Sequence, residues 1–304
     1  MVSIMKEITA YLIIFICSII LFFSNITYEA SYNALLMFFD KLVPSLFISM
    51  FVVRFLYYTN SLSYILKPLY KIFNKIFNTS NDSLNLIVSC LFLGFPSSAS
   101  LINEQYINNN IDRKGALRLI YCISIATPAF IISTVGFIIF NNVSIGLSLF
   151  GIQIIIIFIL LFFTRGTRID YNASSNSYNV FNSIKLSISN SITTLGLIAG
   201  YLMIALSIGA IINILTNYHF TFFISSILEF SSGILNSLAY IYTANFEDAI
   251  LFVSCILGFG GLCVHLQVMM LSYDIKPKYF KYLGFRIIQV ILTYLIIYIG
   301  FVLL

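Results

Sequence analysis

The sequence predicts an all-α, polytopic integral membrane protein with roughly nine hydrophobic segments, some of them broken or re-entrant. Two observations predict this class. Of 304 residues, 60% are hydrophobic and only 9% are charged, whereas a soluble domain usually carries about 25% charged residues. Several apolar runs are also long enough to cross a hydrocarbon core, which takes about 20 helical residues, and the clearest are residues 8–23, 143–163 and 192–215.

Residues 1–39 form the expected N-terminal anchor. The apolar run at 8–23 lacks a small-residue cleavage site before Asn25 and is followed by further spans, so we expect it to be retained. A second span is predicted at residues 42–58, where the side chain of Arg54 is expected to extend to the interface.

Residues 62–78 combine a charged face and an apolar face at helical spacing. Lys67, Lys71 and Lys75 recur on one face, and leucines, isoleucines and a phenylalanine fall on the other. This pattern predicts a basic amphipathic helix that lies on a membrane surface.

The next two apolar segments both contain interruptions. Residues 84–102 include Gly94, Pro96 and a run of small residues, so this segment is expected to be broken or re-entrant and to enter and leave on one side. Residues 116–140 contain a Thr-Pro pair at mid-length, and the proline is expected to unwind that helix.

We expect two halves joined by a polar linker. The first half covers residues 40–163 and ends with the span at 143–163, and the Ser- and Asn-rich residues 164–186 form the linker. The second half covers residues 187–304, with segments predicted at residues 192–215, 220–242, 249–271 and 280–304.

An internal similarity makes related halves plausible. The stretch at residues 89–96 resembles the stretch at 254–261, and a polar connection and another span follow each. Weak internal symmetry joined to Gly- or Pro-interrupted segments is typical of a transporter's substrate site. Small residues at such places can also serve close helix packing alone.

The charges predict orientation and exclude one class of partner. The net charge of +5 comes from Lys and Arg in short connections, which favours cytoplasmic loops and anionic lipid headgroups over DNA or RNA. The lipid bilayer is therefore an expected partner, and nucleic acid is not. Arg118 and Arg286 lie in the first turns of their spans, where they either reach the interface or balance an anionic ligand.

Nothing in the sequence predicts an enzyme, a metal site or a cofactor. The five cysteines lie in apolar stretches without C-x-x-C spacing, which favours simple burial. There is no H-E-x-x-H, G-x-S-x-G or P-loop pattern, so we expect no catalytic residues. Without an ATP site, transport would be passive, ion-coupled or driven by a partner.

Three polar residues inside apolar segments are candidates for a solute site. Glu229 lies about 13 Å into its segment at helical rise, where its carboxylate either handles solute or protons or is structural, as the cap of a half-helix or the partner of an Arg. His265 and Gln267 follow the Gly260-Gly261 interruption. An intramembrane histidine is a proton acceptor or simply part of an interhelical hydrogen bond.

Four motifs carry a resemblance to a known family. They are Leu93-Gly94-Phe95-Pro96-Ser97-Ser98-Ala99, Ile125-Ala126-Thr127-Pro128-Ala129-Phe130, Leu228-Glu229-Phe230-Ser231-Ser232-Gly233 and the stretch from Gly260 to Val268. In this order they resemble the YlbJ-type sporulation integral membrane proteins, which are similar to concentrative nucleoside transporters through a nucleoside recognition, or Gate, domain. The resemblance covers most of the chain from about Asp40 onward.

The resemblance implies two Gate-type halves and transport of a small anionic solute, dipicolinic acid, across the outer forespore membrane during sporulation. The alternatives are a non-transporting scaffold needed for spore cortex formation and a nucleoside-type transporter. Whether copies assemble into a homo-oligomer is left open. The residues expected to bind the solute are Gly94, Pro96, Ser97, Ser98, Thr127, Pro128, Glu229, Gly260, Gly261, His265 and Gln267.

Overall fold

The computed structural model describes residues 11, 14, 15, 17–172, 179–217, 221–241 and 245–303. These residues are almost entirely helical. Of the predicted anchor span at residues 8–23, the described part comprises residues 11, 14, 15 and 17–23, and residues 17–22 are helical. The described chain begins its longer elements with α2 (Ser24–Met37), which continues through the π-helical turn η1 (Phe38–Leu42) into α3 (Val43–Tyr58).

The predicted amphipathic segment is helical but divided. It consists of α4 (Ser61–Leu66), the 3-10 turn η2 (Lys67–Leu69) and α5 (Tyr70–Phe77). Pro68 lies in the turn, where it cannot donate to a preceding carbonyl. Ile65, Ile72 and Ile76 are exposed beside the lysines, so the apolar face remains available to a membrane surface.

The first interrupted segment is a helical hairpin. Helix α6 (Ser83–Leu93) turns at residues 94–96 and returns as α7 (Ser97–Ile107), and the two helices pack against each other. This agrees with the expected re-entrant form. The second interrupted segment consists of α8 (Arg113–Cys122), a mostly extended stretch at residues 123–127 and the π-helix η3 (Phe130–Ile139).

Helix α9 (Val143–Phe163) has the bounds that its apolar run predicts, and it packs along η3. The approach is close because two glycines face each other: a Cβ on Gly136 would lie 2.7 Å from the Cα of Gly146. Small residues commonly permit such contacts between membrane helices.

The long helix α10 (Val180–Leu215) begins inside the predicted linker, so the polar connection is shorter than residues 164–186. Helices α11 (Thr221–Leu228) and α12 (Phe230–Ile241) form a second packed hairpin. Helix α13 (Phe246–Phe259) is interrupted at Gly260 and resumes as α14 (Gly261–Leu271), and α15 (Tyr279–Leu303) completes the described chain.

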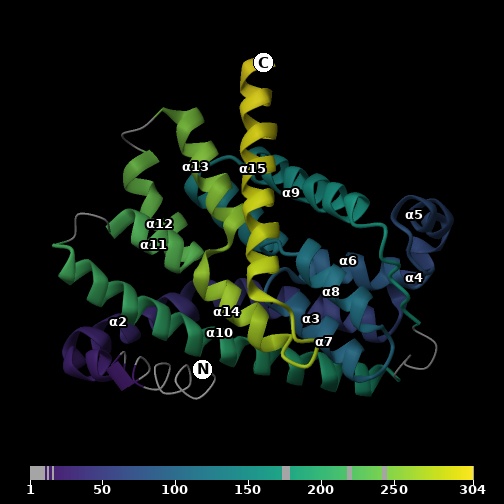
Figure 1. Ribbon diagram of the computed structural model, residues 1–304, viewed down its shortest axis with the longest axis horizontal. Coiled ribbons are helices and arrows are strands. Elements are labelled where there is room, and N and C mark those ends of the chain that lie inside the picture. Colours follow the sequence, from purple (N-terminus) through teal and green to yellow (C-terminus); the bar gives the residue numbers. More distant parts are fainter. Residues whose placement is uncertain are drawn as a thin grey trace, which may run out of the picture.

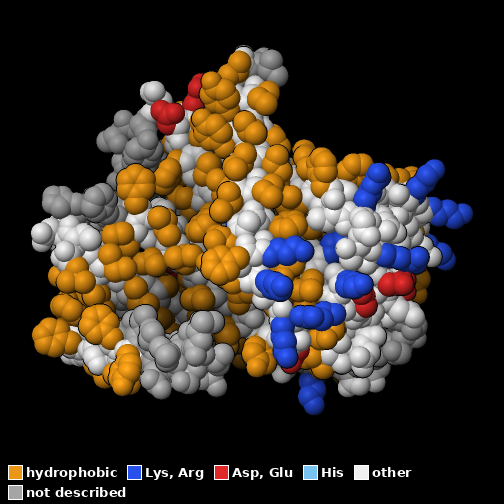
Figure 2. Space-filling view, in the orientation of Figure 1, with side chains coloured by type: hydrophobic (Ala, Val, Ile, Leu, Met, Phe, Trp, Pro, Cys, Tyr) orange, Lys and Arg blue, Asp and Glu red, His pale blue; other side chains and the backbone are white. Residues whose placement is uncertain are grey.

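Within the described residues, four helical stretches are long and apolar enough to cross a membrane: Val143–Phe163, Val180–Leu215, Phe246–Leu271 and Tyr279–Val302. In Figure 1, α15 stands upright beside α9 and α13, while α10 runs along the opposite edge with α2 and α3. Large apolar side chains cover much of the surface in Figure 2. The chain is therefore an integral membrane protein.

Arg54 does not extend to the interface. It is fully buried, and its Nη1 lies 3.5 Å from the Glu104 carboxylate of α7. Tyr58 donates to the same carboxylate at 2.7 Å, and Asn190 of α10 donates to the Tyr58 hydroxyl at 2.7 Å. This cluster ties the first hairpin to α3 and α10, because a buried charge needs a partner.

Arg118 and Arg286 are also buried, with 4% and 1% of their surface exposed. Arg118 donates to the carbonyl of Phe77, the last residue of α5, and to the carbonyl of Leu161, in the last turn of α9. A helix leaves its last four carbonyls without intrahelical partners. Arg118 therefore satisfies helix ends, and neither arginine extends its side chain away from the protein.

Candidate functional site

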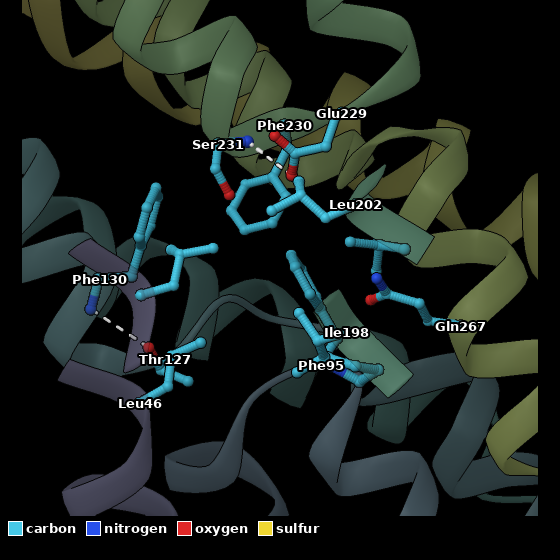
Figure 3. A pocket seen from close by; sticks show the side chains of 13 residues that line it. Leu46, Phe95, Thr127, Phe130, Ile198, Leu202, Glu229, Phe230, Ser231 and Gln267 are labelled. Atoms are coloured by element: carbon cyan, nitrogen blue, oxygen red, sulfur yellow. Dashed lines mark hydrogen bonds between the residues drawn. The ribbon is translucent and has the colours of Figure 1, made fainter. Parts of the chain in front are cut away.

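The interrupted segments meet at a small, partly open cavity. It is lined by both hairpin turns, by the stretch between α8 and η3, and by α14, with further walls from α10 and the start of α3. Figure 3 shows the lining side chains converging on this space. The lining residues are Leu42, Leu46, Phe95, Pro96, Thr127, Phe130, Ile198, Leu202, Glu229, Phe230, Ser231, Val264 and Gln267.

The turn of the first hairpin rests directly on the interrupted segment that follows it. The backbone N–H of Phe95 donates to the Ile125 carbonyl at 2.7 Å. Gly94 has a φ of +64°, and a Cβ there would lie 2.6 Å from the backbone nitrogen of Thr127. Only glycine allows this conformation together with this contact.

The open backbone between α8 and η3 finds hydrogen-bond partners within the protein. Thr127 accepts at Oγ1 from the Phe130 N–H at 3.2 Å, which caps the second half of the segment. Arg286 of α15 donates to the carbonyls of Tyr121 and Ser124 at 2.8 and 2.7 Å. Non-helical backbone is tolerated in a membrane only where such partners exist or a cavity is lined.

The second hairpin turns at Glu229, which caps its own returning helix. The carboxylate accepts from the N–H groups of Ser231 and Ser232 at 3.1 and 2.6 Å, and the residue is 3% exposed. The negative charge thus faces the positive end of α12. Of the roles that the sequence left open for Glu229, the capping role is the one seen here.

This second turn rests on the interruption between α13 and α14. Gly261 has a φ of +74°, and a Cβ there would lie 2.9 Å from the backbone nitrogen of Phe230. A Cβ on Gly260 would lie 3.4 Å from the ring of Phe95, in the first hairpin's turn. The same pairing of a hairpin turn with a broken helix therefore occurs twice, and the two pairs touch.

The repetition differs from the one that sequence similarity indicates. Residues 89–96 include a hairpin turn, whereas the similar residues 254–261 include a broken helix. In three dimensions the hairpin α6–α7 corresponds in form to α11–α12, and the broken segment α8–η3 corresponds to α13–α14.

The cavity is aromatic on one side and polar at a few points. The ring of Phe230 lies between Phe95 and Phe130 in edge-to-face contacts, each with centroids 5.1 Å apart. The polar groups come from Thr127, Glu229, Ser231 and Gln267, and the described lining includes no Lys, Arg or His. The volume is about 30 Å³, which holds a few water molecules at most.

The predicted site residues divide into three groups. Pro96, Thr127, Glu229 and Gln267 line the cavity. Three glycines instead allow the close contacts between the hairpin turns and the broken segments. They are Gly94, Gly260 and Gly261.

The remaining predicted residues lie outside the described lining. Ser97 and Ser98 are buried in the first turn of α7, where the Ser98 N–H bonds to the Gly94 carbonyl at 2.8 Å. Pro128 lies within the broken segment. His265 is buried with a ring nitrogen 2.9 Å from the Phe259 carbonyl, so it satisfies the last residue of α13.

Sequence reasoning missed the aromatic side chains of the cavity. Phe95, Phe130 and Phe230 each stand at or next to an interruption. The only signal in the sequence is that each of these residues lies beside a break. Phenylalanine occurs 30 times in this chain, so its position next to a break does not by itself predict a cavity wall.

Comparisons with known proteins add no assignment, since no family model, curated protein or solved structure matches the chain. The candidate site is defined by its geometry.

Proposed function

We propose that the chain is a membrane transporter for a small planar solute, with dipicolinic acid, carried across the outer forespore membrane during sporulation, as the first candidate. The proposal rests on one observation: two hairpin turns and two broken helices, from opposite ends of the sequence, surround a single cavity. Discontinuous helices that meet near the middle of a membrane protein are typical of transporter substrate sites.

The size of the cavity makes the described conformation a closed one. About 30 Å³ is far below the several hundred Å³ of an ordinary small-molecule site. Admission of an aromatic ring requires the hairpin turns to separate, and Phe95 and Phe230 are the side chains that meet across them. Two Gate-type halves that move relative to each other would supply this motion.

The charge of the lining bears on which solute is carried. Glu229 places a carboxylate at the cavity, and the described lining has no cation to balance a dianion. Transport of dipicolinate would therefore require Glu229 to be protonated or to stay with its cap on α12 as the turns open. The hydroxyl groups of Ser231 and Thr127 and the amide of Gln267 remain as hydrogen-bond donors to the solute.

A nucleoside-type solute is the second candidate, and the same lining favours it. Three phenylalanine rings suit stacking of an uncharged base, while Gln267 and Glu229 offer the donor and acceptor groups that base edges require. A carboxylate at the cavity does not oppose a neutral solute.

Uptake into proteoliposomes tests the proposal and separates the two solutes. We expect saturable uptake that falls at least about tenfold in Gln267→Ala and Thr127→Ala, because each leaves a solute group unpaired. Thr193→Ala is the matched control, since Thr193 is exposed on α10 and outside the described lining.

Glu229→Gln distinguishes the charge of the solute. The variant removes the negative charge and keeps one acceptor oxygen for the cap, so that one of the two capped N–H groups, of Ser231 or Ser232, loses its partner. Faster dipicolinate uptake in the variant supports the anion, and slower nucleoside uptake supports the base. If folded, inserted protein carries neither solute, the scaffold alternative replaces the transporter.

A further inference from the structure

A second and larger pocket lies away from the proposed solute site. Its volume is about 320 Å³, and it opens among the ends of α8, α9 and α15. Lys114, Arg118 and Lys281 line it, and its described lining contains no Asp or Glu. The pocket therefore has a strongly positive wall.

Two of these cations are free to bind a ligand. Neither Lys114 nor Lys281 forms an ion pair within the described residues, and both are exposed. The Lys281 ammonium lies 5.1 Å from the centroid of the Tyr121 ring, which also lines the pocket. Arg118 is buried, and its N–H groups already donate to carbonyl and hydroxyl oxygens of the protein. It therefore adds positive charge to the pocket without a direct hydrogen bond to a ligand.

The position of the pocket is that of a membrane interface. It is lined by Phe163, the last residue of the candidate span Val143–Phe163, and by Lys281, close to the start of the span Tyr279–Val302. The end of one candidate span and the start of another therefore meet at this pocket, among its Lys and Arg side chains. Figure 2 shows these charges grouped directly beside the hydrophobic surface.

The lining of this pocket also has an apolar part. Phe163 is 80% exposed, and Phe285 of α15 forms another wall. A ligand bound here would contact both lysines and the aromatic rings of Phe163 and Phe285. That combination matches an amphiphile with a negatively charged head.

We propose that this pocket binds the phosphodiester headgroup of an anionic phospholipid, with Lys114 and Lys281 on the phosphate and the acyl chains against Phe163 and Phe285. Basic pockets between membrane helices on the cytoplasmic side commonly bind such headgroups. The lysines are flexible point charges, which suits a tetrahedral phosphate presented from the bilayer. The bound lipid would hold α8, α9 and α15 together at their basic ends.

The test measures lipid binding to the purified full chain in detergent. Native mass spectrometry and thermal unfolding are followed with added phosphatidylglycerol or phosphatidylcholine. We expect phosphatidylglycerol to remain bound and to raise the unfolding temperature, and phosphatidylcholine to do neither. Since each lysine near an anionic headgroup contributes about fivefold to binding, Lys114→Gln with Lys281→Gln should weaken phosphatidylglycerol binding at least about tenfold.

The control removes the same charge elsewhere. Lys185→Gln with Lys276→Gln replaces two exposed lysines that lie outside both the described lining of the pocket and the amphipathic segment, and it should leave binding within about twofold of the wild type. Equal losses in both double variants would mean diffuse surface attraction and overturn the site. Equal binding of phosphatidylcholine would overturn its charge selectivity. Stabilisation by inorganic phosphate alone, to the same extent, would assign the pocket to a free anion instead of a lipid.

Discussion

Single residues decide how the helix interruptions are held closed. Gly94 and Gly261 let a hairpin turn lie on the backbone of a broken segment, and Glu229, Arg286 and His265 satisfy the backbone groups that the breaks expose. An unpaired backbone group inside a membrane costs several kcal/mol. These side chains are therefore structural, and Glu229 has this structural role while it also lines the cavity where a solute would bind.

Gly94→Ala should destabilise the protein by about 1–3 kcal/mol, because the new methyl group would meet the backbone of Thr127 in a strained φ region. Gly151→Ala is the matched control, since a Cβ on Gly151 of α9 meets no atom within 4 Å. Thermal unfolding of both variants in detergent measures the difference. Equal unfolding temperatures would show that the turn does not rest on Thr127.

Arg286→Leu should reduce the folded fraction sharply. The variant keeps an apolar side chain in the space but leaves the Tyr121 carbonyl without its donor, a loss of about 1–3 kcal/mol, and leaves the Ser124 carbonyl with Gln289 Nε2 at 3.2 Å as its remaining donor. Arg286→Lys retains the positive charge but lacks the planar guanidinium that donates to two carbonyls at once. Its stability should lie between those of the wild type and Arg286→Leu. Size-exclusion profiles and unfolding temperatures report the order, and a stable Arg286→Leu protein would contradict the role.

At the scale of elements, the first hairpin is fixed at both ends. Its turn contacts the break before η3, and its far end is tied to α3 and α10 through Arg54, Tyr58, Glu104 and Asn190. The second hairpin has the corresponding contact at its turn. Movement of the first turn away from the cavity therefore has to bend or rotate a hairpin that is anchored by an ion pair between the buried Arg54 and the partly buried Glu104.

A double-mutant cycle on that ion pair should reveal strong coupling. Arg54→Met or Glu104→Gln alone leaves one partner unpaired, and we expect each to cost about 3 kcal/mol, with part of the loss recovered in the double variant. The pair Arg168–Asp170 has the same 3.5 Å separation but is 61% and 67% exposed. Its cycle should give less than about 1 kcal/mol, and equal coupling in both pairs would contradict the buried anchor.

At the scale of the whole molecule, the sequence predicted the class and the interruptions but not how they meet. The apolar run at residues 143–163 predicted α9 with the bounds that the structure has. Gly94, Thr127-Pro128 and Gly260-Gly261 predicted helix breaks at the places where the helices are broken. These signals are local, so they survive in a single sequence. The start of α10 at Val180 was missed because Ser and Asn also occur in that helix.

Long-range contacts were beyond the sequence. Arg54, Arg118 and Arg286 stand near span ends, where extension to water is the usual outcome. Each instead finds acceptors on segments distant in the sequence, such as Glu104, Leu161 and Ser124. Likewise, the cavity depends on side chains from six separate segments, whose convergence no local pattern records.

The central claim is that the two hairpin turns separate to admit a solute, and a reversible lock across the cavity tests it most directly. Phe95→Cys and Phe230→Cys would be combined in a chain whose native cysteines, Cys17, Cys90, Cys122, Cys255 and Cys263, are replaced by alanine. Each single Phe→Cys variant serves as the control. Dipicolinate and nucleoside uptake into proteoliposomes would be measured with the pair oxidised and after reduction. We predict that oxidation abolishes uptake only in the pair and that reduction restores it, whereas full uptake by the oxidised pair would contradict the account.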